Sequence, residues 1–312
     1  MAAMDPGAPG TEVLKLHDGR SLAYTERGDP RGVPIIHQHG MPGSRLDHEA
    51  DDEFYRSLGV RVITPDRPGY GMSDSHPHRR LLDWPADVVE LADLLAIKRF
   101  GITALSGGGI YALACAAAIP DRVIEVVVTG CPAPMQRPGA LAGMRFMTRA
   151  GVWLGSSAPW LLEAGAQALS GLIRRYPRFF VDQFNRDKPP PDRHWLSMPS
   201  VSAGAADTLR EALRPGAWGY VQDIRVLSTP WGFALSDIKV PVELWHGDLD
   251  TVIPISHGRY LASAIPNAAL KVCPGEGHML LWNHLAEILA AAGGVGPSAV
   301  GSFASAGPSA VA

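Results

Sequence analysis

The sequence predicts an α/β fold, in which a mostly parallel sheet carries helices on both faces and a helical insertion separates two of its strands. Three observations predict it. Strand-like and helix-like segments alternate from residue 33 to residue 129. Between residues 132 and 236 no convincing buried strand occurs and helical stretches take over. The alternation then resumes at Val240. Because a parallel sheet is covered on both faces, its strands are expected to be apolar throughout.

The elements of the first half follow from apolar spacing and turn residues. Residues 12–26 predict a β-hairpin with its turn at 17–20. Strands are expected at 33–38, 60–64, 99–105 and 123–129. Helices are expected at 44–58, after Asp83 as an N-cap, and at 108–118.

The second half contains the insertion and the end of the sheet. Helical stretches are expected at 139–155, 160–176 and 207–213, with a polar connector at 185–192. Strands follow at 241–246 and 269–273. The predicted organisation is a flexible arm (1–11), a core (12–131 and 237–292), a helical cap (132–236) and a disordered tail (293–312). The tail is low in complexity and repeats Gly-Pro-Ser-Ala-Val.

Composition narrows the function classes. The net charge is −3 and the sequence pI is near 6.4, so no basic surface for nucleic acid or anionic membrane is expected. Three widely spaced cysteines argue against a disulfide framework and a zinc site. The start of the chain has no secretory pattern, and no apolar run could span a bilayer, which predicts a cytoplasmic protein. No metal or cofactor motif occurs, and a homodimer stays open.

Ser106 stands at the apex of a predicted strand–turn–helix unit. Three glycines follow it, and then a run of helix formers. Ala104 and Gly108, two residues away on either side, are small enough to leave room for a strained serine. This is the G-x-S-x-G nucleophile pattern with Ala in place of the first Gly. The alternative interpretation is a glycine-rich turn that only opens a core helix.

Two further residues complete a catalytic constellation. A serine needs a base to take its proton, and the base needs a third group to orient it. Asp250 and His278 each follow the end of a predicted strand, where open α/β sheets place their ligand crevice. We therefore expect Ser106 as nucleophile, His278 as general base and Asp250 as its orienting acid. Asp248 and His284 are the competing acid and base.

Four segments together resemble the α/β-hydrolase fold family. Residues 39–44 (His-Gly-Met-Pro-Gly-Ser) are similar to its oxyanion loop, and residues 62–74 to its D-x-x-G-x-G-x-S segment. Residues 246–254 resemble its acid loop, and Gly277-His278 its histidine loop. The resemblance covers nearly all of residues 12–292. It implies an eight-stranded sheet and a cap that closes over the serine.

The resemblance also implies the residues around the nucleophile. Backbone N–H groups of Met41 and Gly107 are expected to form the oxyanion hole. Asp66 and Arg67 are expected to be a structural pair at the rim. The substrate pocket is expected to include His39, which also has a competing role in organising its loop, and four apolar cap residues: Met144, Met147, Trp153 and Trp160.

The predicted function is a serine hydrolase that cleaves an ester, thioester, lactone or related carbonyl bond of a small hydrophobic substrate. Other triad chemistry remains an alternative: C–C bond hydrolysis, a lyase or cyclase reaction, or cofactor-free oxygenation. A proline iminopeptidase would need carboxylates in the cap to hold the free amine of its substrate. The first half of the cap, residues 144–173, contains Glu163 as its only acidic residue. A non-catalytic ligand-binding protein is the third alternative. The serine argues against epoxide hydrolases and haloalkane dehalogenases, which resemble one another in using Asp there.

Overall fold

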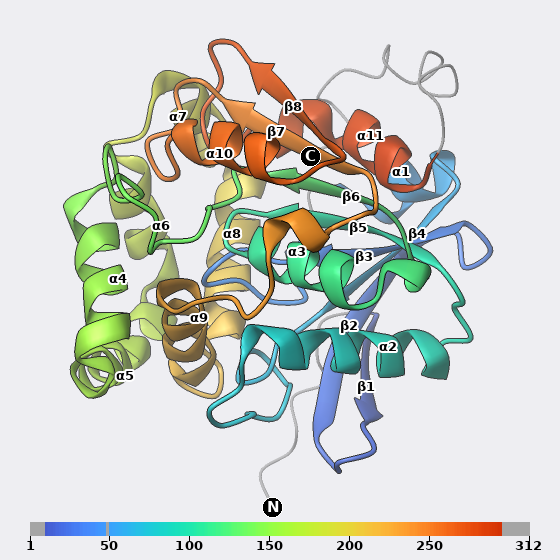
Figure 1. Ribbon diagram of the computed structural model, residues 1–312. Helices are drawn as coiled ribbons and strands as arrows, with labels where there is room; N and C mark the ends of the chain where they lie inside the picture. The colour runs from blue at the N-terminus through green and yellow to red at the C-terminus, as the bar shows by residue number, and fades with distance from the viewer. Residues whose placement is uncertain (1–9, 48–49, 295–312) are drawn as a thin grey trace, which may run out of the picture.

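The computed structural model describes residues 10–47 and 50–294. Its centre is one eight-stranded sheet with the strand order β1-β2-β4-β3-β5-β6-β7-β8 (Figure 1). Only β2 runs antiparallel to its neighbours, and all other pairs are parallel. The strands are β1 (Thr11–Lys15), β2 (Ser21–Gly28), β3 (Val33–Gln38), β4 (Val60–Pro65), β5 (Phe100–Leu105), β6 (Val123–Thr129), β7 (Val242–Gly247) and β8 (Ala268–Cys273).

Successive strand residues supply two separate cores. Ile36 and Val126 point to one face of the sheet, whereas Ile35 and Val127 point to the other. Helices α2 (Trp84–Leu94), α3 (Gly108–Ala118) and α10 (Ser256–Ala264) cover the first face. Helices α1 (Asp52–Ser57) and α11 (Leu281–Ala292) cover the second. The predicted three-layer arrangement is confirmed.

Six helices lie between β6 and β7, and we call residues 146–228 the helical insert. Its helices are α4 (Phe146–Ser157), α5 (Pro159–Arg175), α6 (Pro177–Asn185), α7 (Pro190–Ser197), α8 (Pro199–Ala212) and α9 (Trp218–Ser228). Helices α5 to α8 each begin with proline, whose fixed φ and missing N–H suit a first helical position. In the described parts of the chain outside the insert, three 3₁₀ turns occur, at Leu81–Asp83, Pro120–Arg122 and Leu235–Asp237.

Several boundaries differ from the sequence expectations. Among the described residues of 44–58, only 52–57 are helical, because Asp51 caps α1 and Arg45 is held in buried polar contacts instead. The predicted connector at 185–192 already contains the start of α7. The hairpin begins at Thr11 rather than Glu12. Residues 1–9 and 295–312, which include most of the predicted arm and tail, lie outside the described residues.

A buried ionic cluster joins the insert to the sheet, and we call Asp223, Arg67, Arg79, Tyr70 and Tyr111 the Asp223 cluster. Asp223 of α9 accepts hydrogen bonds from all four other side chains. Burial raises the pKa of this carboxyl, but the two guanidinium groups outweigh it and lower the pKa to about 2. The charge is therefore compensated in the interior, where an unpaired ion would be costly.

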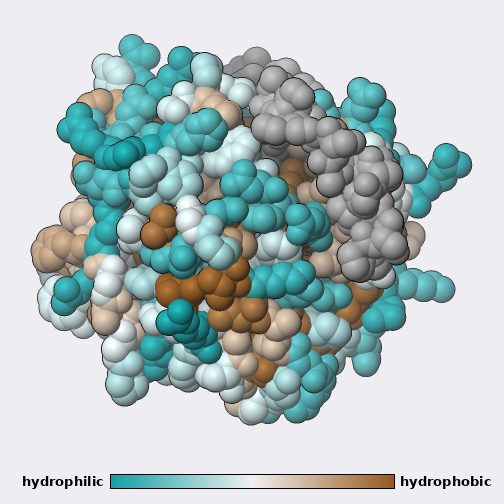
Figure 2. Space-filling model, turned by 90° about the horizontal axis from the view of Figure 1, so that it is seen from above, coloured by the Kyte–Doolittle hydropathy of each residue, from teal (hydrophilic) through white to brown (hydrophobic). Residues whose placement is uncertain are grey.

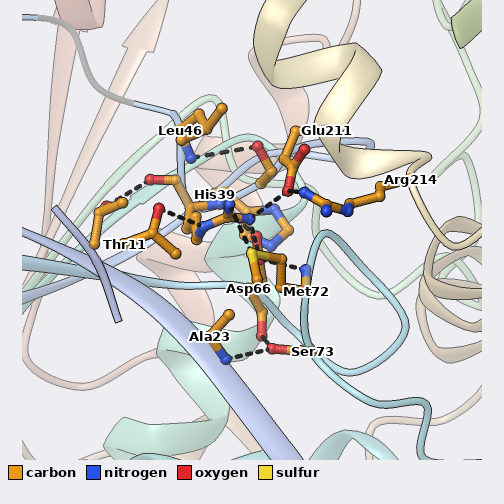
Figure 3. A network of polar contacts seen from close by, with 12 residues as sticks. Thr11, Ala23, His39, Leu46, Asp66, Met72, Ser73, Glu211 and Arg214 are labelled. Carbon is orange, nitrogen blue, oxygen red and sulfur yellow. Dashed lines mark hydrogen bonds and ion pairs between the residues drawn. The ribbon is translucent and has the colours of Figure 1, made fainter. Parts of the chain in front are cut away.

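A second contact joins the insert to the sheet through Arg45. Its guanidinium lies between Asp66 and Glu211 of α8, with Nη1 at 2.8 and 2.7 Å from their oxygens. Asp66 also accepts from the backbone N–H of Met72 (Figure 3). The expected Asp66–Arg67 pair is therefore not formed, because Asp66 pairs with Arg45 while Arg67 belongs to the Asp223 cluster.

The surface carries hydrophobic side chains in several places. Seen from above, hydrophobic residues gather near the middle of a mainly hydrophilic face (Figure 2). None of the helices within 10–47 and 50–294 has the length and apolar character that crossing a bilayer requires.

We predict that Asp223→Ala lowers the free energy of unfolding by about 3–5 kcal/mol, because it leaves two buried arginines without their carboxylate. Asp207→Ala is the matched control, since Asp207 forms an exposed pair with Arg210 on the same insert and should change stability by less than about 1 kcal/mol. Urea unfolding measures both.

The acid dependence follows from the same carboxyl. Its folded pKa, about 2, lies below the ordinary 3.8, so its contribution is fully present above about pH 4 and is lost as the pH falls towards 2. Equal losses of unfolding free energy in Asp223→Ala and Asp207→Ala would contradict the role given to Asp223.

Candidate active site

Ser106 lies in the sharp turn between β5 and α3 with a φ of +54°, a conformation that only a crowded, well-supported backbone retains. Its N–H donates to the carbonyl of Thr129 over 2.8 Å. The neighbouring glycines have no room for a side chain. An added Cβ at Gly108 would lie 2.2 Å from the Gln38 carbonyl oxygen, and one at Gly109 would lie 2.3 Å from Cys131 Sγ. Tight packing on both sides therefore fixes this turn.

Asp250 and His278 form a buried pair at the same edge of the sheet. His278 Nδ1 donates to Asp250 Oδ2 over 2.7 Å, which leaves Nε2 as the ring nitrogen able to accept a proton. Asp250 Oδ1 accepts the N–H groups of Val252 and Ile253, which fixes the carboxylate. Burial would raise the pKa of Asp250, but His278 and these hydrogen bonds hold it below its ordinary value.

Met41 and Gly107 lie against each other beside the serine. A Cβ at Gly107 would lie 2.4 Å from Met41 Sδ, so glycine is needed for this contact. Within the described residues, neither backbone N–H donates to another protein group. Met41 and Gly107 line one cavity together with Ser106 and His278. Two unused donors beside a serine are what an oxyanion hole requires.

The cavity that contains these groups has a volume of about 790 Å³. Helices of the insert supply much of its wall. The insert residues in that wall carry no charge and include Val152, Val181, Leu196, Val201, Ile224 and Leu227. On the core side, Leu105, Val252 and Ile253 add apolar surface, while Arg27, Asp47, Asp51 and Asp52 add charged groups. The uncharged wall supplied by the insert suits an apolar substrate group.

Comparison with known proteins identifies the family. Residues 33–285 match the α/β-hydrolase fold family. The chain belongs to the α/β-hydrolase fold family. It is 28% identical to a non-heme chloroperoxidase of Streptomyces lividans, over 87% of this chain and 94% of that one. It is 26% identical to a pimeloyl-[acyl-carrier protein] methyl ester esterase of Aromatoleum aromaticum, over 74% and 85% of the two chains.

Among solved structures, this α/β-hydrolase is similar to a hydrolase from Pseudomonas aeruginosa. The TM-score is 0.67 at 23% identity, and the match covers 92% of this chain and 99% of that chain. This likeness shows the shared fold. Further distant relatives are named as a 2-hydroxy-6-oxo-6-phenylhexa-2,4-dienoate hydrolase of Burkholderia cepacia and a proline iminopeptidase of Xylella fastidiosa.

The competing acid and base of this hydrolase lie elsewhere. Asp248 accepts the backbone N–H of Gly275 on the surface. His284 pairs with Glu276 over 2.8 Å and packs on the Trp245 ring. Neither lines the cavity, so the geometry favours Asp250 and His278 over both.

The five residues expected in the substrate pocket are placed differently. Only Met147 lines the cavity, and because it is also exposed it lies at the mouth. Trp153 and Trp160 are 59% and 71% exposed on the outer helices of the insert, away from the sheet (Figure 1). Met144 is buried in the core, and His39 is buried beneath the oxyanion loop. Helical spacing alone does not tell which face of an insert helix meets the cavity.

His39 instead organises the oxyanion loop. Its Nδ1 donates to the Gly40 carbonyl, and its Nε2 accepts the N–H of Arg67. Acceptance at Nε2 requires a neutral ring with its proton on Nδ1. Burial, together with the charge of Arg67, holds the pKa of His39 well below its ordinary value. Arg67 in turn donates to the carbonyls of His39 and Gly40.

Two residues near the site have a weaker sequence signal. Asp47 accepts the Gly40 N–H over 3.2 Å. Burial raises the pKa of Asp47 to about 6, although this hydrogen bond and the charge of Arg67 both act to lower it. Gly130, with a φ of +56°, follows β6 directly, and a Cβ there would lie 2.8 Å from His278 Cε1. The position of Gly130 directly after a predicted strand was the sequence signal for its place near the site, because catalytic loops lie at the carboxyl ends of the strands.

We predict that Asp250→Asn slows turnover of an ester substrate by about 10²–10⁴-fold, because the amide favours the wrong histidine tautomer. Asp248→Asn is the matched control and should leave turnover within about 2-fold, as its side chain only holds a surface turn. Steady-state kinetics with p-nitrophenyl acetate measure both. The opposite ranking of the two variants would assign the acid to Asp248.

Proposed function

We propose that this chain is a serine hydrolase that cleaves an ester, thioester, lactone or related carbonyl bond of a small hydrophobic substrate through an acyl-enzyme. One observation carries the proposal. Ser106 at its strained turn lines the same cavity as His278, whose Nδ1 is bonded to the buried Asp250. The relatives named as esterases support this reaction class.

The mechanism follows from the available atoms. His278 Nε2 takes the Ser106 hydroxyl proton as the oxygen attacks the substrate carbonyl. The N–H groups of Met41 and Gly107 stabilise the oxyanion. No rearrangement is needed, because Arg67 already holds the loop that carries Met41 and close packing fixes the turn that carries Gly107. The protonated His278 then gives its proton to the leaving group. Water, activated by the same ring, releases the acid and restores the serine.

The cavity lining selects the substrate class. The insert residues that line it, as far as the structure describes them, include no carboxylate or amine. A free amino group, which an iminopeptidase holds with insert carboxylates, would find no partner on that wall, because the cavity's carboxylates (Asp47, Asp51 and Asp52) lie on the core side. An apolar acyl or ring group would instead be desolvated there, next to the oxyanion donors.

The decisive experiment is labelling with a fluorophosphonate, which reacts only with an activated serine. We predict that the wild-type chain is labelled at one site and that Ser106→Ala abolishes labelling. The same variant should lower hydrolysis of p-nitrophenyl esters by about 10³-fold or more with an unchanged fold by circular dichroism. Wild-type labelling without any ester or lactone turnover would favour other triad chemistry. No labelling would indicate a non-catalytic protein.

We further predict that Val152→Phe shifts the preferred p-nitrophenyl ester towards shorter acyl chains, because it fills part of the cavity from α4. Trp160→Ala is the control, since its ring lies on the outside of α5, and it should leave the chain-length profile unchanged. A profile altered by Trp160→Ala but not by Val152→Phe would place the acyl group somewhere else.

A further inference from the structure

Asp192 of the insert is bonded directly to the backbone that carries the catalytic histidine. Its Oδ2 accepts the N–H of His278 over 3.0 Å, and its Oδ1 accepts the N–H of Met279 over 2.9 Å. The carboxylate is almost completely buried, at 1% exposure. Figure 1 shows α7, to which it belongs, beside the end of β7. One insert side chain thus satisfies two consecutive amides of the histidine loop.

The contact requires the glycine before the histidine. An added Cβ at Gly277 would lie 2.3 Å from Asp192 Oδ1 and 2.5 Å from its Cγ. The carboxylate therefore packs flat against the backbone at Gly277. This gives the Gly-His pair of the sequence a local physical reason, because any side chain at residue 277 would push α7 away.

The segment that carries Asp192 is stiff. Three consecutive prolines, residues 189–191, stand immediately before it, and each fixes its own φ. Pro190 is the first residue of α7. A carboxylate on such a support loses little conformational entropy when it binds the two amides.

Lys188 places a positive charge at the same junction. Its side chain is buried, its Nζ has no hydrogen-bond partner among the described residues, and it lies 3.7 Å from the Phe184 ring centroid. Burial lowers the pKa of this amine to about 8, while Asp192 and Asp250 act to raise it and Arg145 to lower it. A buried amine without a hydrogen bond among the described residues therefore directly precedes the proline run.

We propose that Asp192 is a positioning residue for the catalytic base: through the backbone of His278 it makes the alignment of that ring depend on the docking of the helical insert. The proposal rests on the proposed function in giving His278 the role of base. Asp250 holds the ring by Nδ1, and Asp192 holds the peptide to which the ring is attached.

The test compares Asp192→Ala and Asp192→Asn with Asp187→Asn. Asp187 is a matched control because it lies on the same connector, is 67% exposed and pairs with Arg145 at the surface. The readouts are the rate of fluorophosphonate labelling, kcat and KM for p-nitrophenyl acetate, and the melting temperature.

Asp192→Ala should lower the labelling rate and kcat together by about 10–100-fold, since a misplacement of about 1 Å costs that much. KM should stay within about 2-fold, because Asp192 does not line the cavity. Asp192→Asn keeps the shape and one acceptor oxygen and should recover part of the loss. If Asp192→Ala does not fold, the Asn variant gives the same test. The control should match the wild type.

A lower melting temperature with unchanged kcat in both Asp192 variants would overturn the proposal and leave a purely structural contact.

A spectroscopic readout keeps this test independent of the reaction. The proton between His278 Nδ1 and Asp250 is expected at low field in the proton NMR spectrum, and Asp192→Ala should shift or broaden it while Asp187→Asn should not. An unchanged resonance would refute the positioning role. An unlabelled, inactive wild type whose resonance still responds to Asp192→Ala would refute the hydrolase function alone.

Discussion

The buried carboxylate of Asp223 is the interaction on which the arrangement of the site depends. It comes from α9 of the insert, yet its partners come from the loop after β4 and from α3, the helix that follows the nucleophile. Arg67 and Arg79 keep it charged in the interior. Because Arg67 also donates to the carbonyls of His39 and Gly40, the insert, the oxyanion loop and the nucleophile helix form one connected unit.

This connection separates the tasks of positioning and chemistry. The reacting groups, Ser106 and His278, have little freedom of their own, since each lies on a short loop at a strand end. Their geometry comes from neighbours that do not react: glycines that admit a close backbone and carboxylates that accept loop amides. In a preorganised site of this kind, the free-energy cost of orienting the groups is met during folding, so the groups need no reorganisation in each turnover.

The sequence predicted the sheet, its order of elements and the Ser-Asp-His constellation, because each depends on local patterns next to strand ends. It did not predict Asp223 or Asp192 as partners of the site. Such pairs join residues more than 80 positions apart and leave no local spacing to recognise. The tryptophans at 153 and 160 show the same limit, since helical periodicity identifies an apolar face but not which surface that face meets.

The insert therefore acts on the site in two ways that cannot be varied independently. Its α4, α6, α7, α8 and α9 helices supply the cavity wall, and α7 also contacts the histidine loop. A substitution that moves the wall to admit a larger substrate also strains the α7 contact, so selectivity and turnover are expected to change together. Substitutions on α4 escape this coupling best, because α4 packs on α5 and α9 and makes no contact with the histidine loop through Asp192. The α4 wall positions, Val152 among them, are therefore where substrate choice can change with the least effect on the base.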